Sequence, residues 1–236
     1  MIETRINKYL AGLGIASRRK IDEMITARRI KVNGKIIENG VKVTDKDIIE
    51  IDNKKINKKQ EKKVYYILNK PLDVISAASD DRGRKTVVDY IRCKERIFPI
   101  GRLDYNTTGL IILTNDGELF NKIIHPKAEV FKKYEAVIKG KIDEKDIKKL
   151  ENGVKLEDGM TLPAKVEVID INERRSIVDI SIREGRNRQV RRMFAELGYR
   201  VINLQRKEIG NMTLGNLRVG QYRELTKKEV EYLYSL

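Results

Sequence analysis

One carboxylate stands in a segment where it could do chemistry. Residues 101–117 read GRLDYNTTGLIILTNDG, and Asp104 lies in a glycine- and threonine-rich loop directly before an apolar run. That run predicts a buried strand, and the NDG sequence predicts the turn that closes it. A side chain at such a junction is held by a rigid scaffold and is still reached by a substrate. Arg102 is near enough in sequence to keep Asp104 ionised. An aspartate that only accepts hydrogen bonds from loop amides gives the same pattern.

A second candidate is a basic helix within the sequence REGRNRQVRRMFAELGYR. We expect Asn187 to be its N-cap and Gly198 to end it. The apolar residues that recur there at helical spacing are Val190, Met193, Phe194 and Leu197.

The arginines of this helix point in different directions. At about 100° per residue, Arg191 lies at the edge of the apolar stripe, so it is best placed to reach a half-buried carboxylate. Arg188 and Arg192 point away from the stripe, which fits either contacts with phosphates or a solvated face.

A tyrosine lies in a predicted strand between these two segments, in the sequence FKKYEAV. Tyr134, Ala136 and Ile138 alternate, which indicates a strand with one buried face. Taken alone, this alternation indicates ordinary packing of the tyrosine.

The first quarter of the chain predicts a small domain of two helices leading into strands. Apolar residues recur at helical spacing from Ile6 to Leu13, and Ser17 is the expected N-cap of a second helix. From Ile30 the pattern changes to alternation, with Asn33-Gly34 as a tight turn. Residues 1–63 contain 17 Lys+Arg and 9 Asp+Glu, so they carry 17 − 9 = +8 of the formal +15.

This basic segment resembles the small RNA-binding domain first seen in ribosomal protein family four. In that domain a helix-turn-helix packs on strands, and the basic second helix and the following turn contact RNA. The resemblance implies RNA binding by Arg5, Lys8, Ser17, Arg18, Arg19, Lys20, Arg29, Lys31 and Asn33.

A lysine-rich stretch, DNKKINKKQEKK at residues 52–63, predicts a solvated linker. We therefore expect one domain at residues 1–60 and a second at 61–236. Apolar and β-branched runs alternate with helical patterns in the second part, so the fold class is predicted to be α+β with a mixed sheet.

Three motifs, in their order along the chain, are similar to those of the RsuA/RluB-type ribosomal RNA pseudouridine synthases. They are YYILNKPLDVISAASDDRGRKTV, GRLDYNTTGLIILTNDG and REGRNRQVRRMF, and the resemblance covers nearly the whole chain. It implies that Asp104 is the catalytic carboxylate, that Tyr134 stacks on the target base, and that Arg191 pairs with Asp104. It implies no cofactor and no metal.

Further residues follow more loosely from the same resemblance. Asn69, Lys70 and Pro71 are expected to shape the pocket floor, with Leu68 and Ile182 in the core near it. The basic residues expected to contact RNA in this domain are Arg102, Arg188 and Arg192.

Composition restricts the function classes. The net charge of +15 and a pI near 9.7 favour a polyanionic partner. With one cysteine and one histidine, the chain cannot form an internal disulfide or a His/Cys zinc cluster. No apolar stretch is as long as a membrane span or resembles a signal peptide, so we expect a cytoplasmic protein with no membrane partner. We also expect it to be a monomer.

Three functions therefore remain to be separated. The first is an enzyme that acts on ribosomal RNA. Its sequence is more similar to the family members that act on large-subunit RNA than to those that act on small-subunit RNA. A non-enzymatic RNA-binding or ribosome-assembly protein is the alternative, although a pure binder has no need of Asp104, Tyr134 and Arg191. An RNA glycosidase or nuclease would need a site open to water.

Overall fold

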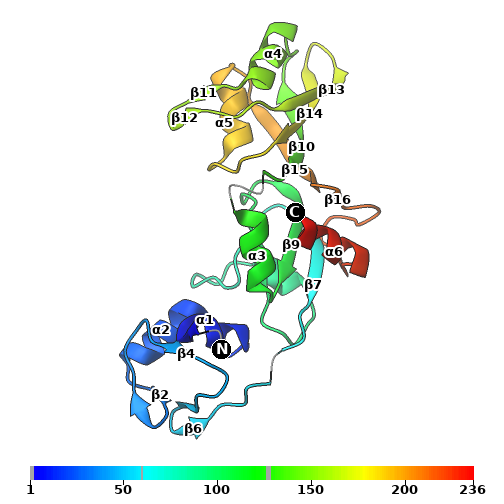
Figure 1. Ribbon diagram of the computed structural model, residues 1–236. Helices are drawn as coiled ribbons and strands as arrows, with labels where there is room; N and C mark the ends of the chain where they lie inside the picture. Colours follow the sequence, from blue (N-terminus) through cyan, green and yellow to red (C-terminus); the bar gives the residue numbers. More distant parts are fainter. Residues whose placement is uncertain (1–2, 60, 126–128) are drawn as a thin grey trace. The chain divides into compact units, whose positions relative to one another are not determined.

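The computed structural model describes residues 3–59, 61–125 and 129–236. Contacts divide the chain into two compact units, each with helices and strands (Figure 1). The first contains the described residues up to Val64, together with Cys93–Arg96 and Asn115–Gly117, and the second contains the rest. The second unit combines helices with a mixed sheet, which confirms the predicted α+β class.

The first unit has two helices, α1 (Ile6–Gly12) and α2 (Arg18–Thr26), beside short strands. Ser17 caps α2 as predicted, since its Oγ accepts a hydrogen bond from the Lys20 amide at 3.1 Å. The strands form a four-stranded sheet in the order β3-β2-β5-β6 and a separate pair β1-β4. Their bounds are β1 Thr4–Arg5, β2 Ile30–Val32, β3 Lys35–Ile36, β4 Lys42–Val43, β5 Ile49–Ile51 and β6 Lys54–Lys55.

The turn between β2 and β3 confirms the sequence prediction. Asn33 and Gly34 both have positive φ, 51° and 79°, as a tight hairpin turn requires. The Asn33 side chain also accepts a hydrogen bond from the Ile48 amide at 2.8 Å and donates one to Asp47 at 2.8 Å. Asn33 therefore anchors the hairpin to the start of β5.

The second unit contains a nine-stranded sheet in the order β13-β14-β10-β15-β9-β7-β17, with β16 beside β15 and β8 beside β9. Strands β15 and β9 are parallel, and the other strand pairs described in this sheet are antiparallel. The bounds are β7 Tyr65–Lys70, β8 Phe98–Ile100, β9 Thr108–Thr114, β10 Lys132–Lys139, β13 Lys165–Ile171, β14 Arg175–Ile182, β15 Val201–Ile209, β16 Met212–Thr213 and β17 Tyr222–Glu224.

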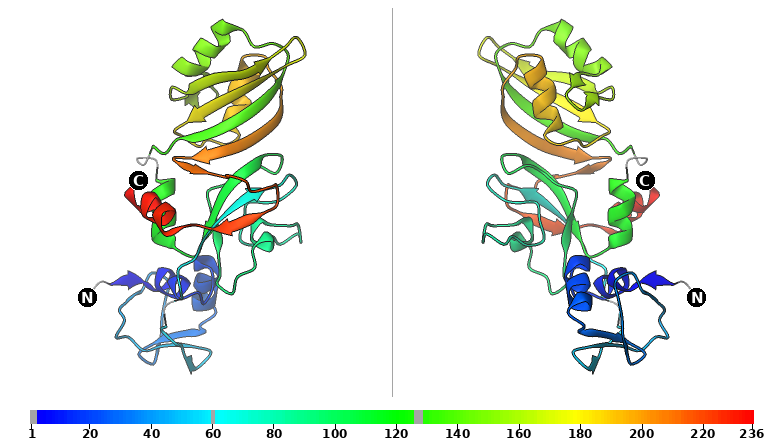
Figure 2. Two further views of the ribbon diagram at one scale, coloured as in Figure 1. Left: turned by 90° about the vertical axis from the view of Figure 1, so that its right-hand side faces the viewer. Right: turned by 90° about the vertical axis from the view of Figure 1, so that its left-hand side faces the viewer.

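Four α-helices and one 3-10 turn complete this unit in the described residues. Figure 2 shows α4 and α5 beside the β13-β14-β10-β15 part of the sheet. A small hairpin, β11 (Lys155–Leu156) with β12 (Gly159–Met160), lies next to α5. The helices are α3 Gly117–Ile124, α4 Glu144–Asn152, α5 Gln189–Glu196 and α6 Lys227–Ser235, and the 3-10 turn η1 is Val87–Tyr90.

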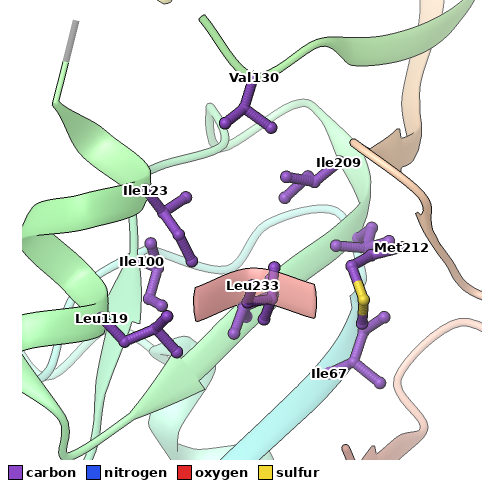
Figure 3. Packing of buried hydrophobic residues seen from close by; sticks show 10 residues of the cluster. Ile67, Ile100, Leu119, Ile123, Val130, Ile209, Met212 and Leu233 are labelled. Carbon is purple, nitrogen blue, oxygen red and sulfur yellow. The ribbon is translucent and has the colours of Figure 1, made fainter. Parts of the chain in front are cut away.

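One apolar core supports the strands that lead to the Asp104 loop. Figure 3 shows Leu119 and Ile123 of α3 packed with Leu233 of α6, Ile67 of β7 and Ile100 of β8. Burying each such side chain stabilises the fold by about 1.5–3 kcal/mol. The loop that follows Ile100 therefore starts from a strand that is held in this core.

Gly109 explains how β15 can lie alongside β9. Its φ is +110°, and a Cβ built on it would lie 2.2 Å from the Arg206 carbonyl oxygen. Any other residue would push the two parallel strands apart. The glycine in the sequence NTTG is therefore required by a close backbone approach.

The start of α5 differs from the prediction. Arg188, with φ 47° and ψ 32°, occupies the N-cap position that we expected for Asn187, and it makes no side-chain cap bond. The helix ends at Glu196, and Gly198 follows with φ +86° as expected. Because Arg188 precedes the helix, the helical geometry used to orient it does not apply.

Candidate active site

The loop that carries Asp104 connects β8 to β9 and is held by hydrogen bonds from Lys70. The Lys70 Nζ donates hydrogen bonds to three carbonyl oxygens, those of Pro71 at 2.9 Å, Asp104 at 3.1 Å and Thr107 at 2.9 Å. Its side chain is completely buried at the end of β7. One ammonium thus fixes the main chain at Asp104 and at Thr107, three residues further along the loop.

Burial has an electrostatic cost for Lys70. It lowers the pKa of the Lys70 ammonium to about 8, although the Asp104 and Asp73 carboxylates oppose this shift. The charged form needed to bond all three carbonyls is therefore present at neutral pH and is lost within the mildly alkaline range.

Ser76 holds the same loop from its other end. The Ser76 Oγ donates to the Leu103 carbonyl at 2.9 Å and accepts from the Leu103 amide at 3.1 Å. The Thr107 amide also donates to the Asp104 carbonyl at 3.1 Å. The residue before Asp104 and the carbonyl of Asp104 itself are thereby fixed, so the loop is preorganised around this side chain.

Asp104 and Tyr134 line one cavity of about 620 Å³. The Asp104 side chain remains 31% exposed, so it is accessible to a molecule in the cavity. Apolar side chains form much of the wall, including Leu103, Ile182 and Leu204. The space has the mixed apolar and polar lining typical of a site for a flat, partly polar ligand such as a nucleobase.

Tyr134 lies on the buried face of β10, as the alternation predicted, and Arg206 of β15 lies beside it. The Arg206 Nη1 donates to the Tyr134 hydroxyl oxygen at 3.4 Å, and its Nε donates to the Leu110 carbonyl at 2.8 Å. Arg206 is only 3% exposed, and its Nη2 has no hydrogen-bond partner in the described part of the chain.

Arg206 is the functional-site residue that sequence reasoning missed. The signal was present, because Leu204 and Arg206 share one parity in β15 and Leu204 is apolar. An arginine on the buried face of a strand needs partners inside the protein. Here those partners come from β9 and β10.

The cation nearest the Asp104 carboxylate is Arg188, and the predicted pairing with Arg191 is not present. The Arg188 Nη1 lies 3.8 Å from the Asp104 Oδ2 and 3.4 Å from the Asn106 Oδ1. Arg188 reaches the loop because it precedes α5 in a left-handed conformation, a strained backbone state that is concentrated at functional sites.

Arg191 instead binds main-chain carbonyls beside the site. Its Nη2 donates to the Asn106 carbonyl at 2.7 Å, and its Nη1 donates to the Val201 carbonyl at 3.2 Å. Burial and the nearby Arg188 charge lower the pKa of the Arg191 guanidinium, whereas Asp104 raises it. Arg191 therefore holds the Asp104 loop against β15.

The two other arginines expected to contact RNA in this unit differ in availability. Arg102 is exposed and lines the Asp104 cavity. Arg192 forms a two-point ion pair with Asp158, at 3.0 and 2.9 Å. The charge of Arg192 is thus already neutralised by a neighbouring carboxylate.

Most of the residues expected at the pocket do not line the cavity. Ile182 lines it, but Leu68, Asn69, Lys70 and Pro71 do not. The reason is the strand order, since β9 lies between β7 and β15. Asn69 is instead used structurally, donating to the Leu217 carbonyl at 2.9 Å.

In the first unit, the expected RNA-binding residues fall into three groups. Lys20 pairs with Glu23, Arg29 forms a two-point ion pair with Asp52, and Lys31 donates to Asn53. Ser17 and Asn33 serve as cap and turn anchor. The remaining expected residues are exposed cations without an ion pair to any described residue, namely Arg5, Lys8, Arg18 and Arg19.

The described residues contain no group of three or more His, Cys, Asp or Glu side chains that could hold a metal ion. They also contain no helix that is both long enough and apolar enough to span a membrane.

Comparison with known proteins assigns the chain to a family. Residues 64–196 match the RNA pseudouridylate synthases, and residues 4–49 match the S4 domain. The chain therefore belongs to the RNA pseudouridylate synthase family, whose members are isomerases. This confirms the family resemblance seen in the sequence motifs.

Individual relatives agree with this assignment. The chain is 49% identical to the ribosomal large subunit pseudouridine synthase B of Bacillus subtilis, covering 98% of this chain and 96% of that protein. It is 47% identical to the ribosomal large subunit pseudouridine synthase E of Vibrio parahaemolyticus, covering 70% and 75%. A crystal structure of a pseudouridylate synthase aligns with a TM-score of 0.71 at 32% identity, covering 97% of this chain and 99% of that chain.

Proposed function

We propose that this protein isomerises a uridine of large-subunit ribosomal RNA to pseudouridine, with Asp104 as the reacting carboxylate. The observation that carries the proposal is the shared cavity of Asp104 and Tyr134, together with a loop that Lys70 fixes by two hydrogen bonds. The names of the Bacillus and Vibrio relatives support ribosomal RNA, and its large subunit, as the substrate.

The reaction rearranges bonds within one nucleotide. The bond from N1 of uracil to C1′ of the ribose breaks, the base turns, and a new bond joins C5 to C1′. The proton on C5 must then leave, and N1 gains a proton. The uridine has to leave the RNA stack first, at a cost of a few kcal/mol that contacts with phosphates offset.

Two routes fit a carboxylate at the position of Asp104. In the first, Asp104 attacks C1′ and holds the ribose as an ester while the uracil turns. In the second, Asp104 removes the C2′ proton, the electrons of that C–H bond form a C1′=C2′ double bond, and the uracil leaves from C1′ as an anion. After the base turns, C5 bonds to C1′ and the proton returns to C2′. Both routes require water to be excluded, because hydrolysis would leave an abasic site. The apolar wall formed by Leu103, Ile182 and Leu204 serves that requirement.

Tyr134 and Arg188 have separate roles in this proposal. The Tyr134 ring stacks on the uracil, and its hydroxyl, fixed by Arg206, faces the proton that must move. Arg188 places a positive charge beside the Asp104 carboxylate. Arg102 contacts a phosphate at the mouth of the cavity.

The first unit contributes docking to RNA. Its exposed cations without a described ion-pair partner, such as Arg18 and Arg19, are available to phosphates. Removing residues 1–60 should weaken RNA binding and reduce the slope of log affinity against log salt by about 0.7–0.9 per lost phosphate contact. We further propose that the protein acts as a monomer in the cytoplasm.

The decisive experiment replaces Asp104 by asparagine. Asp104→Asn keeps the shape and removes the reactive charge, so single-turnover pseudouridine formation on large-subunit ribosomal RNA should fall by orders of magnitude while RNA affinity changes little. Asp81→Asn, an exposed aspartate outside the cavity, is the matched control. Near-normal conversion by Asp104→Asn would remove the central residue of the proposal.

Two measurements refine the result. Substrate carrying deuterium at C2′ should react more slowly only if Asp104 removes that proton. Mapping pseudouridines in ribosomal RNA from cells with and without the gene should identify the uridine, and unchanged maps would favour a binding or assembly protein.

A further inference from the structure

A second hollow lies beside the Asp104 cavity, in the second unit. It is a groove of about 840 Å³ lined by residues of the Asn106 loop, the end of β10, the helix α5 and the start of β15. Four of its lining residues are cations and none is acidic; the cations are Lys139, Arg188, Arg191 and Arg200. The Asp104 cavity, in contrast, also contains Asp104, Glu129 and Glu184.

The fold brings two of these cations together at a strand end. Lys139 is the last residue of β10, and its amide donates to the Arg200 carbonyl at 2.9 Å. Both residues are exposed, and neither forms an ion pair with any described residue. This contrasts with Arg192 and Lys207, which bind Asp158 and Glu135.

Clustering like charges without neutralisation is unfavourable unless an anion binds there. The groove presents several cations to a ligand. One of them, Arg191, is held in the wall because its guanidinium donates to the Asn106 and Val201 carbonyls. Ile202, 51% exposed, adds apolar surface. A cationic groove with apolar surface along it suits single-stranded RNA.

The groove and the uridine cavity share a wall residue. Arg188 lines both, and its Nη1 lies within 3.8 Å of the Asp104 carboxylate. A strand whose uridine enters the cavity would therefore leave its neighbouring nucleotides at the groove. An acidic peptide would match the charge but has no reason to lie next to this cavity.

We propose that this groove binds the phosphodiester backbone of the single-stranded RNA segment next to the flipped uridine, with Lys139 and Arg200 as phosphate ligands. The proposal rests on the proposed function, because it takes the uridine in the Asp104 cavity as its starting point. It assigns to Lys139 and Arg200 a site separate from the S4 domain.

The test removes the two cations that have no role at Asp104. Lys139→Gln/Arg200→Gln should weaken binding of the full substrate RNA and reduce the slope of log affinity against log salt by about 1.4, or about 0.7 for each single-strand phosphate contact. The full-length control Lys155→Gln/Arg218→Gln removes the same charges at exposed positions outside both hollows, and its slope should change less.

A shortened RNA separates this site from a general charge effect. With the segment next to the uridine deleted, wild type and Lys139→Gln/Arg200→Gln should bind with equal affinity. A slope change no larger than that of the control, or an equal loss on the shortened RNA, would overturn the proposal. The charge-reversed variant Lys139→Glu/Arg200→Glu should enlarge the effect, and thermal unfolding checks that each variant is folded.

The proposed function is tested separately in the same samples. Pseudouridine formation by the wild-type protein on the full RNA reports on that function alone. If wild type makes pseudouridine and the groove variant binds normally, only the groove assignment fails.

Discussion

The buried ammonium of Lys70 donates a hydrogen bond to the main-chain carbonyl of Asp104 at 3.1 Å. The bond ends at the backbone and not at the carboxylate, so Lys70 sets the position of Asp104 and leaves both carboxylate oxygens to other partners. The same ammonium bonds Pro71 and Thr107. The position of the proposed reacting group thus depends on the protonation of a buried lysine.

Turnover should therefore fall as pH rises through about 8. Burial lowers the Lys70 pKa to about 8, and a neutral amine has too few N–H donors for three carbonyls. The measurement is the single-turnover rate at saturating RNA between pH 6.5 and 9.5. Lys70→Met should be slow at every pH and should lack the alkaline decline.

Unfolding cannot explain that decline, because the stability effect has the opposite sign. The Lys70 pKa is about 8 in the fold and 10.5 for an unperturbed lysine, so between these values the unfolded chain binds more protons. The contribution of this group to the free energy of unfolding then rises with pH. A thermal midpoint that falls in step with activity from pH 8 would contradict this account.

Arg188 and Arg191 should respond differently to replacement by lysine. Arg188 acts on Asp104 through charge, so Arg188→Gln should slow turnover by about fivefold and Arg188→Lys should restore much of it. Arg191 joins the Asn106 and Val201 carbonyls with two nitrogens of one guanidinium. Arg191→Lys should therefore behave like Arg191→Gln, since an ammonium lacks that planar fork.

Single-turnover rates of the four variants, with RNA affinity at fixed salt, decide between the two roles. Rescue by lysine at position 191 and not at 188 would support the pairing expected from the sequence. Equal rescue at both positions would show that the two arginines act on Asp104 in the same way.

The sequence predicted elements whose causes are local. Ser17 caps α2, Asn33-Gly34 forms the hairpin turn, and Tyr134 lies on the inner face of its strand. Each depends on residues within a few positions, which propensity and spacing describe. The family resemblance added the expectation that Asp104 is catalytic, which the local pattern left undecided.

Contacts between distant segments could not be predicted in the same way. Arg206 meets the Leu110 carbonyl across 96 residues of sequence, and this contact depends on the parallel pairing of β15 with β9. The prediction that Arg191 pairs with Asp104 was wrong for a more local reason. Placing the helix start one residue too early treated Arg188 as helical, whereas its φ is 47°.

Gly109→Ala should be severely destabilising. The added Cβ would lie 2.2 Å from the Arg206 carbonyl oxygen, and the φ of +110° is itself unfavourable for alanine. We expect a loss of at least about 2 kcal/mol in the free energy of unfolding, with a loss of turnover because Thr107 and Asp104 precede it. Denaturant unfolding measures the first effect.

Gly117→Ala is the matched control for that change. No atom lies within 4 Å of a Cβ built at Gly117, and the residue begins α3. Alanine there should be neutral or stabilising by up to about 1 kcal/mol. Similar losses in the free energy of unfolding from both variants would show that the close approach of β15 is not the reason for a glycine at position 109.

Arg206 should act on turnover through Tyr134. Tyr134→Phe removes the hydroxyl and keeps the ring, whereas Arg206→Met removes the donor to that hydroxyl and to the Leu110 carbonyl. Leaving a buried carbonyl without a donor costs about 1–3 kcal/mol, so Arg206→Met should also lower the free energy of unfolding by that amount. Each variant should slow single turnover with little change in the RNA concentration that gives half-saturation.

The double variant separates positioning from a purely structural role. If Arg206 works by fixing the Tyr134 hydroxyl, Tyr134→Phe/Arg206→Met should turn over hardly more slowly than the slower single variant, because both changes remove one interaction. Rates are compared at a temperature where denaturant titration shows each variant fully folded, which removes the stability difference. Losses that multiply under those conditions would mean that Arg206 affects turnover independently of Tyr134, through β9 and the Asp104 loop that precedes it.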